Sequence, residues 1–241
     1  MMGRRARPAS RPPASYPTSR QAARAPAEDR ALGRELPFSA IILAGGRSVR
    51  FGRDKSTEMV AGRLLLQHVV DAVGPIASEI VVVRAPGMPP PAVNSETPLR
   101  HVEDVREGGA LAGLYSGLLV CSQPIALALG CDMPLLSRPL LRHLWGLLNR
   151  DTDAVMPLWE GKEEPLHAFY RRTCLSAIEK ALDGGRRRFV DFLPDVRVRY
   201  VTHDELRRLD PEGRSFWNVN YPSDLARILP VLEATVPPTG E

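Results

Sequence analysis

A glycine-rich, cationic segment follows the first strongly apolar stretch of the chain. It runs from Leu43 to Ser56 and reads LAGGRSVRFGRDKS. Gly45 and Gly46 allow backbone N–H groups to approach an anion without a Cβ atom in the way. Charge to match several phosphate oxygens comes from four side chains, those of Arg47, Arg50, Arg53 and Lys55. We therefore predict that this segment binds a polyphosphate.

The spacing of the glycines excludes two familiar phosphate loops. Gly-x-x-x-x-Gly-Lys-Ser/Thr does not match, because Gly46 and Gly52 are one residue too far apart and two residues separate Gly52 from Lys55. Gly-x-Gly-x-x-Gly does not match either, because the glycines of this segment stand at positions 45, 46 and 52. Lys55 is one of only three lysines among 32 basic residues, so a lysine at this position is informative. The alternative is a plain strand-to-helix turn with solvated arginines.

A second candidate is Asp132, which follows the apolar run 125–131. A carboxylate closing a buried strand is costly unless a cation meets it, and ligands of open α/β sheets bind beyond the carboxyl ends of the strands. Mg²⁺ suits this position, because it prefers oxygen ligands and leaves room for nucleotide phosphates and water. The alternative is that Asp132 caps a helix beginning near Ser137.

Apolar runs alternate with helical patterns along the chain, as in βαβ units. We predict strands at 38–43, 79–84, 99–105, 125–131, 153–158, 166–170 and 196–202. Helices are predicted at 64–73, 111–121 and 173–183, and from about residues 137 and 223. The expected fold is a single Rossmann-like α/β domain, with a mostly parallel central sheet and helices on both faces.

The basic charge of the chain is concentrated at its N-terminus. Residues 1–35 contain eight arginines, five prolines and three acidic residues, a net charge of +5 against +4 for all 241 residues, which leaves −1 for the rest. We predict a disordered extension over 1–35, a folded domain over 36–233 and a flexible C-terminus over 234–241. The nearly neutral domain, the absence of a secretory segment and the absence of a long apolar run favour a cytoplasmic protein without nucleic-acid or membrane partners.

Cysteine and histidine spacing does not indicate a zinc site. The three cysteines form no Cys-x-x-Cys pair, so we predict buried thiols rather than a disulfide framework. The five histidines lack the spacing of a helical zinc site.

The chain resembles the molybdenum cofactor guanylyltransferases and their relatives among the small nucleotidyltransferases. Residues 43–55 match the family's signature Leu-Ala-Gly-Gly-x-Ser-x-Arg-x-Gly-x-Asp-Lys, and 131–134 match its Cys-Asp-Met-Pro segment. Residues 62–69 and 218–225 give further support, so the resemblance covers about residues 38–229. It implies a nucleotide-diphospho-sugar transferase-like fold.

The resemblance also implies roles for individual residues. GTP would be bound by Leu43, Ala44, Gly45, Gly46, Lys55, Arg84, Asp104 and Asp132. Lys55, Arg50 and Asp132 would be catalytic, with Mg²⁺ on Asp132. Arg84 stands where the family often has an asparagine, which weakens the case for guanine. From the residues alone, Asp104 is equally a turn former before Gly108.

Two further groups of residues are candidates on the acceptor side. Asn218 and Asn220 resemble family residues that approach the metal; the alternative is an Asx-type turn with Ser223 or Asp224 near a helix cap. An anionic acceptor could face Arg171, Arg172, Arg186, Arg187 and Arg188, although charge runs are usually solvated.

The implied reaction transfers GMP from GTP to the phosphate of molybdenum-molybdopterin and releases pyrophosphate. No general base is required, because a phosphate monoester is largely dianionic near pH 7. Expected partners are GTP, molybdenum-molybdopterin and molybdoenzymes or cofactor-handling proteins, with a monomer or weak homo-oligomer. The alternatives are cytidylyl transfer, nucleotidyl transfer to a sugar phosphate, and a non-catalytic nucleotide-binding cofactor carrier.

Overall fold

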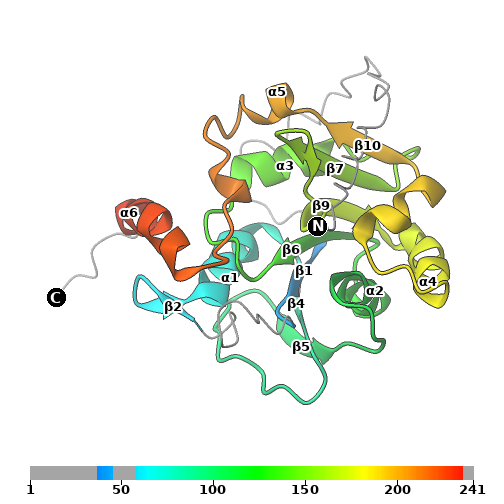
Figure 1. The fold of residues 1–241 in the computed structure, drawn as a ribbon, viewed down its shortest axis with the longest axis horizontal. Helices are drawn as coiled ribbons and strands as arrows, with labels where there is room; N and C mark the ends of the chain where they lie inside the picture. Colours follow the sequence, from blue (N-terminus) through cyan, green and yellow to red (C-terminus); the bar gives the residue numbers. More distant parts are fainter. Residues whose placement is uncertain (1–36, 46–57, 236–241) are drawn as a thin grey trace, which may run out of the picture.

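Strand β1 (Ser39–Leu43) lies in the middle of the central sheet of this computed structural model, which describes residues 37–45 and 58–235. The strand order is β10-β7-β9-β6-β1-β4-β5, and β8 pairs with β7 at one side (Figure 1). The other strands are β4 (Glu79–Arg84), β5 (Leu99–Glu103), β6 (Ile125–Gly130), β7 (Ala154–Trp159), β8 (Lys162–Glu163), β9 (His167–Arg171) and β10 (Val198–Val201). A separate hairpin joins β2 (Met59–Val60) and β3 (Arg63–Leu64).

The sheet is mostly parallel, as predicted. β1 pairs in parallel with β4 and β6, β4 with β5, and β7 with β10. Only β9 in the main strand order runs antiparallel to its neighbours β6 and β7. The strand ends that follow β1, β4, β5, β6 and β7 therefore share one edge of the sheet, which we call the carboxyl edge; the opposite edge is the amino edge.

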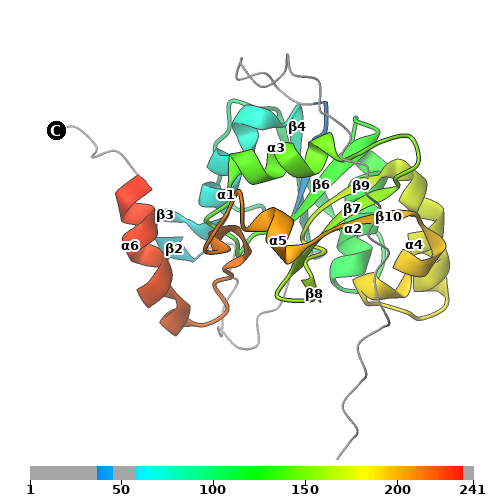
Figure 2. The same ribbon diagram turned by 90° about the horizontal axis from the view of Figure 1, so that it is seen from above.

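Helices cover both faces of the sheet. They are α1 (Leu65–Val73), α2 (Ala110–Val120), α3 (Arg138–Gly146), α4 (Leu175–Asp183), α5 (His203–Leu206) and α6 (Leu225–Thr235). α1 and α3 pack on one face, and α2 and α4 on the other (Figures 1 and 2). Alternation along β1 divides the core accordingly, because Ile42 belongs to the α1 side and Ile41 to the α2 side.

Short 3₁₀ turns connect several of these elements. They span Gly74–Ile76, Arg172–Cys174, Phe189–Asp191, Leu193–Asp195, Arg214–Phe216 and Pro222–Asp224. The predicted helix near residue 223 therefore begins with a 3₁₀ turn and continues as α6. Because α6 reaches Thr235, the helix extends two residues past the predicted domain boundary at 233. In the ranges that the structure describes, no helix has the length and apolar character needed to cross a membrane.

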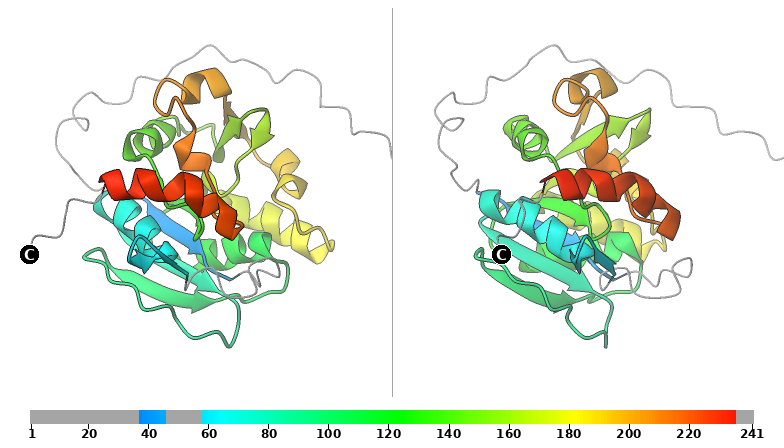
Figure 3. Two further views of the ribbon diagram at one scale, coloured as in Figure 1. Left: turned by 60° about the vertical axis from the view of Figure 1, so that its left-hand side comes forward. Right: turned by 90° about the vertical axis from the view of Figure 1, so that its left-hand side faces the viewer.

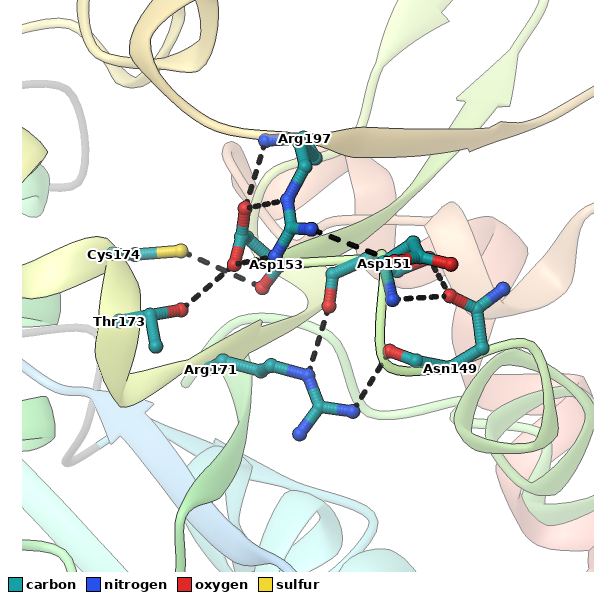
Figure 4. A network of polar contacts seen from close by, with 8 residues as sticks. Asn149, Asp151, Asp153, Arg171, Thr173, Cys174 and Arg197 are labelled. Atoms are coloured by element: carbon teal, nitrogen blue, oxygen red, sulfur yellow. Dashed lines mark hydrogen bonds and ion pairs between the residues drawn. The ribbon is translucent and has the colours of Figure 1, made fainter.

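A polar network ties β7, β9 and β10 together at the amino edge (Figure 4). The carboxylate of Asp153 accepts hydrogen bonds from Arg197 Nε at 2.9 Å and from Thr173 Oγ1 at 2.9 Å. These bonds, above all those from Arg197, hold the pKa of Asp153 well below its usual range. The network therefore stabilises the charged carboxylate beside the start of β7.

Arg171 also lies at the amino edge, because antiparallel β9 sets it opposite Ile125 at the start of β6. The Arg171 guanidinium donates to the backbone carbonyl oxygens of Thr152 at 2.8 Å and Asn149 at 3.0 Å. A contact of Arg171 or Arg172 with an anionic acceptor remains a prediction. Sequence reasoning placed β9 correctly but did not determine its direction.

Candidate active site

The end of β1 is bonded to both neighbouring strands at the carboxyl edge. The N–H of Ala44 donates to the carbonyl oxygen of Val83 at 2.7 Å, and that of Cys131 donates to the carbonyl oxygen of Leu43 at 3.2 Å. The chain from Leu43 to Gly45 therefore leaves the sheet between the end of β4 and the segment that carries Asp132.

Gly45 fits this position because no side chain could. A Cβ atom built on Gly45 would lie 2.7 Å from the backbone nitrogen of Ala85 and 3.0 Å from the carbonyl carbon of Arg84. Backbone atoms cannot turn aside as a flexible side chain can, so a larger residue would push the exit of β1 away from β4.

Most of the cationic segment lies outside the described residues. The predicted roles of Gly46, Arg50 and Lys55, and of Arg47 and Arg53, therefore remain predictions. Both flanks of the segment are placed, however. Gly45 leaves the end of β1, and the carbonyl oxygen of Glu58 accepts from Leu65 N at 2.8 Å, where α1 begins. The residues on either side of the segment are thus fixed, Gly45 at the end of β1 and Glu58 beside the start of α1.

Asp132 lies at this edge, two residues beyond β6, with its side chain half-buried. A Cβ atom built on Gly130 would lie 2.6 Å from Asp132 Oδ1, so a larger residue at position 130 would displace the carboxylate. Sequence reasoning assigned no role to Gly130, which lay inside the predicted strand 125–131. The helix-cap alternative is excluded, because Ser137 Oγ caps α3 by accepting from Leu140 N at 3.4 Å.

The donor set at this edge fits Mg²⁺ better than zinc. Among the residues that the structure places, no group of three or more His, Cys, Asp or Glu side chains could hold a metal ion. Mg²⁺ does not require such a cage, because one or two carboxylates with phosphate oxygens and waters complete its octahedron. Asp132 is positioned to supply the carboxylate. The three cysteines are buried thiols outside any disulfide, as predicted.

Asp104 follows β5 and lies against α2. Its Oδ1 atom is buried and has no hydrogen-bond partner in the described part of the chain. Burial raises the pKa of this carboxyl, and the nearby Ser116 hydroxyl opposes the shift. A buried acceptor left unpaired in the protein is costly, so Asp104 is well suited to accept a hydrogen bond from a ligand N–H group.

Arg84 shares a backbone contact with Asp104 but not a side-chain site. The N–H of Asp104 donates to the carbonyl oxygen of Arg84 at 2.9 Å. The Arg84 guanidinium forms an ion pair with Glu103 at 2.9 Å and also donates to the carbonyl oxygen of Met88. Because Val82 belongs to the α1 side of the core and Val83 to the α2 side, alternation directs Arg84 away from α2.

The segment before α6 completes the edge. The N–H of Val219 donates to the carbonyl oxygen of Asp132 at 2.9 Å, which sets Asn218 and Asn220 on either side of that contact. Asp224 Oδ2 accepts from the N–H of Asn220 at 2.7 Å, which places Asp224 in the 3₁₀ turn that precedes α6. An Asx-type turn of the asparagines remains a prediction. A role of the asparagines at the metal remains a prediction.

Two of the three arginines after α4 contact Asp191. Arg186 donates to the carbonyl oxygen of Asp191 at 2.8 Å, and Arg188 pairs with its carboxylate at 3.1 Å. Arg187 is exposed. Their proposed contact with an acceptor therefore remains a prediction.

A family comparison agrees with this arrangement. The model of the MobA-like NTP transferase domain matches residues 40–198, well over half of the chain. The chain belongs to this family. The matched range includes all but the first residue of β1, together with the cationic segment, Asp104 and Asp132.

Curated relatives in the family are similar along most of their length. A probable molybdenum cofactor guanylyltransferase of Chloroflexus aggregans is 34% identical over 218 residues, covering 83% of this chain and 97% of the relative. A molybdenum cofactor guanylyltransferase of Desulfosudis oleivorans is 31% identical over 207 residues, covering 81% and 96%.

Solved structures confirm the predicted fold. Molybdopterin-guanine dinucleotide biosynthesis protein A from Archaeoglobus fulgidus superposes with a TM-score of 0.68 at 25% identity, over 82% of this chain and all of that one. The 2-C-methyl-D-erythritol 4-phosphate cytidylyltransferase from Thermus thermophilus has a TM-score of 0.61 at 21% identity, over 82% and 100%, and shares the fold.

Proposed function

We propose that this protein transfers GMP from GTP to the phosphate of molybdenum-molybdopterin, with release of pyrophosphate, in the cytoplasm. The observation that carries the proposal is the gathering of Gly45, Asp104 and Asp132 at one edge of the sheet, in a member of the MobA-like family. Relatives named molybdenum cofactor guanylyltransferase support the choice of donor and acceptor.

The nucleotide would lie across the strand ends from β5 to β6. Guanine presents adjacent N–H donors, which suit the unpaired Oδ1 of Asp104. The triphosphate would follow the glycines of the segment after β1, with Arg50 and Lys55 as its cations. Asp132 would hold Mg²⁺ near the α-phosphate. This order matches the order of strands β5, β4, β1 and β6 in the sheet.

The chain's residues would act by positioning and by charge neutralisation. The acceptor is already a phosphate dianion near pH 7, so its oxygen needs no general base. Lys55 and Arg50 would offset charge on the nucleotide phosphates and hold the α-phosphorus in line with the acceptor oxygen. Bound Mg²⁺ would supply further charge neutralisation and orientation of the leaving pyrophosphate.

The proposal is tested by offering the protein all four nucleotides. Purified protein is incubated with Mg²⁺, molybdenum-molybdopterin and ATP, CTP, GTP or UTP in turn, and products are identified by mass spectrometry. We expect the guanine dinucleotide and pyrophosphate from GTP alone. A cytosine dinucleotide from CTP would establish cytidylyl transfer instead. GTP binding without pyrophosphate release would indicate a cofactor carrier.

A further inference from the structure

The C-terminal helix α6 carries a guanidinium held over an indole ring. Arg227 lies in the first turn of α6, and its Cζ atom is 4.1 Å from the centroid of the Trp217 ring. The Arg227 side chain is exposed and Trp217 is half-buried. Cation–π contacts of this kind orient a guanidinium without using its N–H donors.

No ion pair of Arg227 with an acidic side chain is found within the described ranges, whereas several other arginines there form one. Arg84 pairs with Glu103, for example, and Arg197 with Asp153. A solvated arginine needs no partner, but an exposed arginine usually samples many rotamers. The Trp217 ring restricts the rotamers of Arg227, so the five N–H donors of its guanidinium are held in one position.

The Trp217 backbone is tied to the candidate metal residue. Two residues after Trp217, the N–H of Val219 donates to the carbonyl oxygen of Asp132 at 2.9 Å. The next residue, Asn220, donates its N–H to Asp224 Oδ2 at 2.7 Å, and this bond fixes the start of α6. The ring and the guanidinium are therefore both anchored beside the end of β6.

Packing also ties α6 to the far end of the cationic segment. Ile228, next to Arg227, belongs to a small apolar cluster with Leu232, Val219, Leu65 and Val60. Val60 is the third residue after the segment 46–57. Figures 2 and 3 show α6 running beside α1 and the β2–β3 hairpin. α6 thus packs against Val60 and Leu65, and the segment that leads into it is hydrogen-bonded to Asp132 through Val219.

We propose that Arg227 binds a phosphate group of a substrate, with Trp217 holding the guanidinium in position. The inference rests on the proposed function, which has two phosphate-bearing substrates, the triphosphate of GTP and the monoester of molybdopterin. A guanidinium contacts phosphate through two parallel N–H donors, and a preorganised one loses less conformational entropy on binding. Neither Trp217 nor Arg227 is among the residues to which the family resemblance assigns a role.

Binding measurements separate the two sources of phosphate without relying on turnover. GTP with Mg²⁺, inorganic pyrophosphate with Mg²⁺, and molybdopterin are each titrated by calorimetry into the wild type, Arg227→Gln and Trp217→Phe. Arg227→Gln should weaken binding by about ten- to a hundred-fold, because it removes charge-assisted hydrogen bonds. Trp217→Phe keeps an aromatic face and should have a smaller effect. Arg150→Ala is the matched control, since Arg150 is exposed and precedes β7 at the amino edge.

Each result either assigns Arg227 to one of the two substrates or overturns the proposed phosphate site. Weaker binding of GTP and pyrophosphate assigns Arg227 to the nucleotide phosphates, and weaker binding of molybdopterin alone assigns it to the acceptor. Dissociation constants of Arg227→Gln within twofold of the wild type for all three ligands would overturn the proposal, provided that thermal unfolding shows this variant to be folded. If Arg227→Gln does not fold, Arg227→Lys is measured in its place. Failure of the wild type to form the guanine dinucleotide would overturn the proposed function but leave these binding results standing.

Discussion

The N–H of Val219 donates a 2.9 Å hydrogen bond to the carbonyl oxygen of Asp132. This contact joins the C-terminal segment before α6 to the end of β6, although the two are far apart in the sequence. The carboxyl edge therefore brings together residues from both ends of the domain: the end of β1, and the segment that leads to α6.

Lys55→Ala and Asp132→Ala should each lower kcat by about a hundred-fold or more, because each removes a charge that acts on the reacting phosphates. Both variants should keep the wild-type thermal unfolding midpoint within a few degrees. Lys162→Ala and Asp204→Ala, at exposed positions, serve as controls of like chemistry. Near-normal turnover in either site variant would remove that residue from the mechanism.

Asp104→Asn should raise the KM for GTP by about ten-fold or more, because the amide replaces one acceptor oxygen by an NH₂ donor, which cannot pair with the N–H donors of guanine. Stability should not fall, since the substitution removes a buried charge whose Oδ1 atom lacks a partner in the described residues. Steady-state kinetics and urea unfolding measure the two effects. Glu103→Gln, one residue away and exposed, is the control; equal effects at both positions would contradict the assignment.

Gly45→Ala should reduce activity by about ten-fold or more, because the new Cβ atom would lie 2.7 Å from the backbone nitrogen of Ala85. The exit of β1 would have to move, and with it the cationic segment. Gly74→Ala is the control, since the nearest atom to its Cβ lies at 3.5 Å and belongs to a side chain. Unchanged GTP kinetics in Gly45→Ala would show that the segment is not positioned through this contact.

Asp153→Asn should destabilise the fold by about 2 kcal/mol, because it weakens charge-assisted hydrogen bonds from Arg197 to a nearly buried carboxylate. Activity per folded molecule should be unchanged, since the network lies at the amino edge (Figure 4). Asp151→Asn removes a more distant and fully solvated partner of Arg197 and should have no measurable effect. Urea unfolding of the pair gives the comparison.

His167 should make stability depend on pH. The ring is fully buried 4.8 Å from Phe216, and burial lowers its pKa from 6.5 to about 4. Between these values the unfolded state binds the extra proton, so the contribution of His167 falls as pH falls from 6.5 toward 4. Relative to His167→Phe, the wild type should lose about 2 kcal/mol between pH 7.5 and pH 5.

The comparison with His167→Phe is needed because a second group titrates in the same range. Burial raises the pKa of Glu164 to about 7, so its contribution to stability grows as pH falls. That term cancels in the difference between the two proteins. A difference in the free energy of unfolding that does not change with pH would refute the assignment to His167.

The sequence predicted those features that depend on local patterns. Continuous apolar runs located β1, β4 and β6, and Ser137 appeared near the start of α3, where its hydroxyl is the cap. Element ends differed by at most two residues, as for β5, which stops at Glu103.

Features that depend on contacts between distant segments could not be read in this way. The direction of β9 is set by its pairing with β6 and β7, and an apolar run looks the same in either direction, so the sequence did not show at which edge of the sheet Arg171 lies. The two-residue strands β2 and β3 are too short to show a period. The contact of Arg227 with Trp217 depends on how α6 folds back onto its own connecting segment.

A crystal structure of the protein with Mg²⁺ and a non-hydrolysable GTP analogue tests the central claim most directly. We expect guanine N–H donors on Asp104, the triphosphate along residues 45–55 with Lys55 in contact, and the metal ion on Asp132. A nucleotide bound away from the carboxyl edge, or a metal ion that does not touch Asp132, would contradict the proposed site and the reaction built on it.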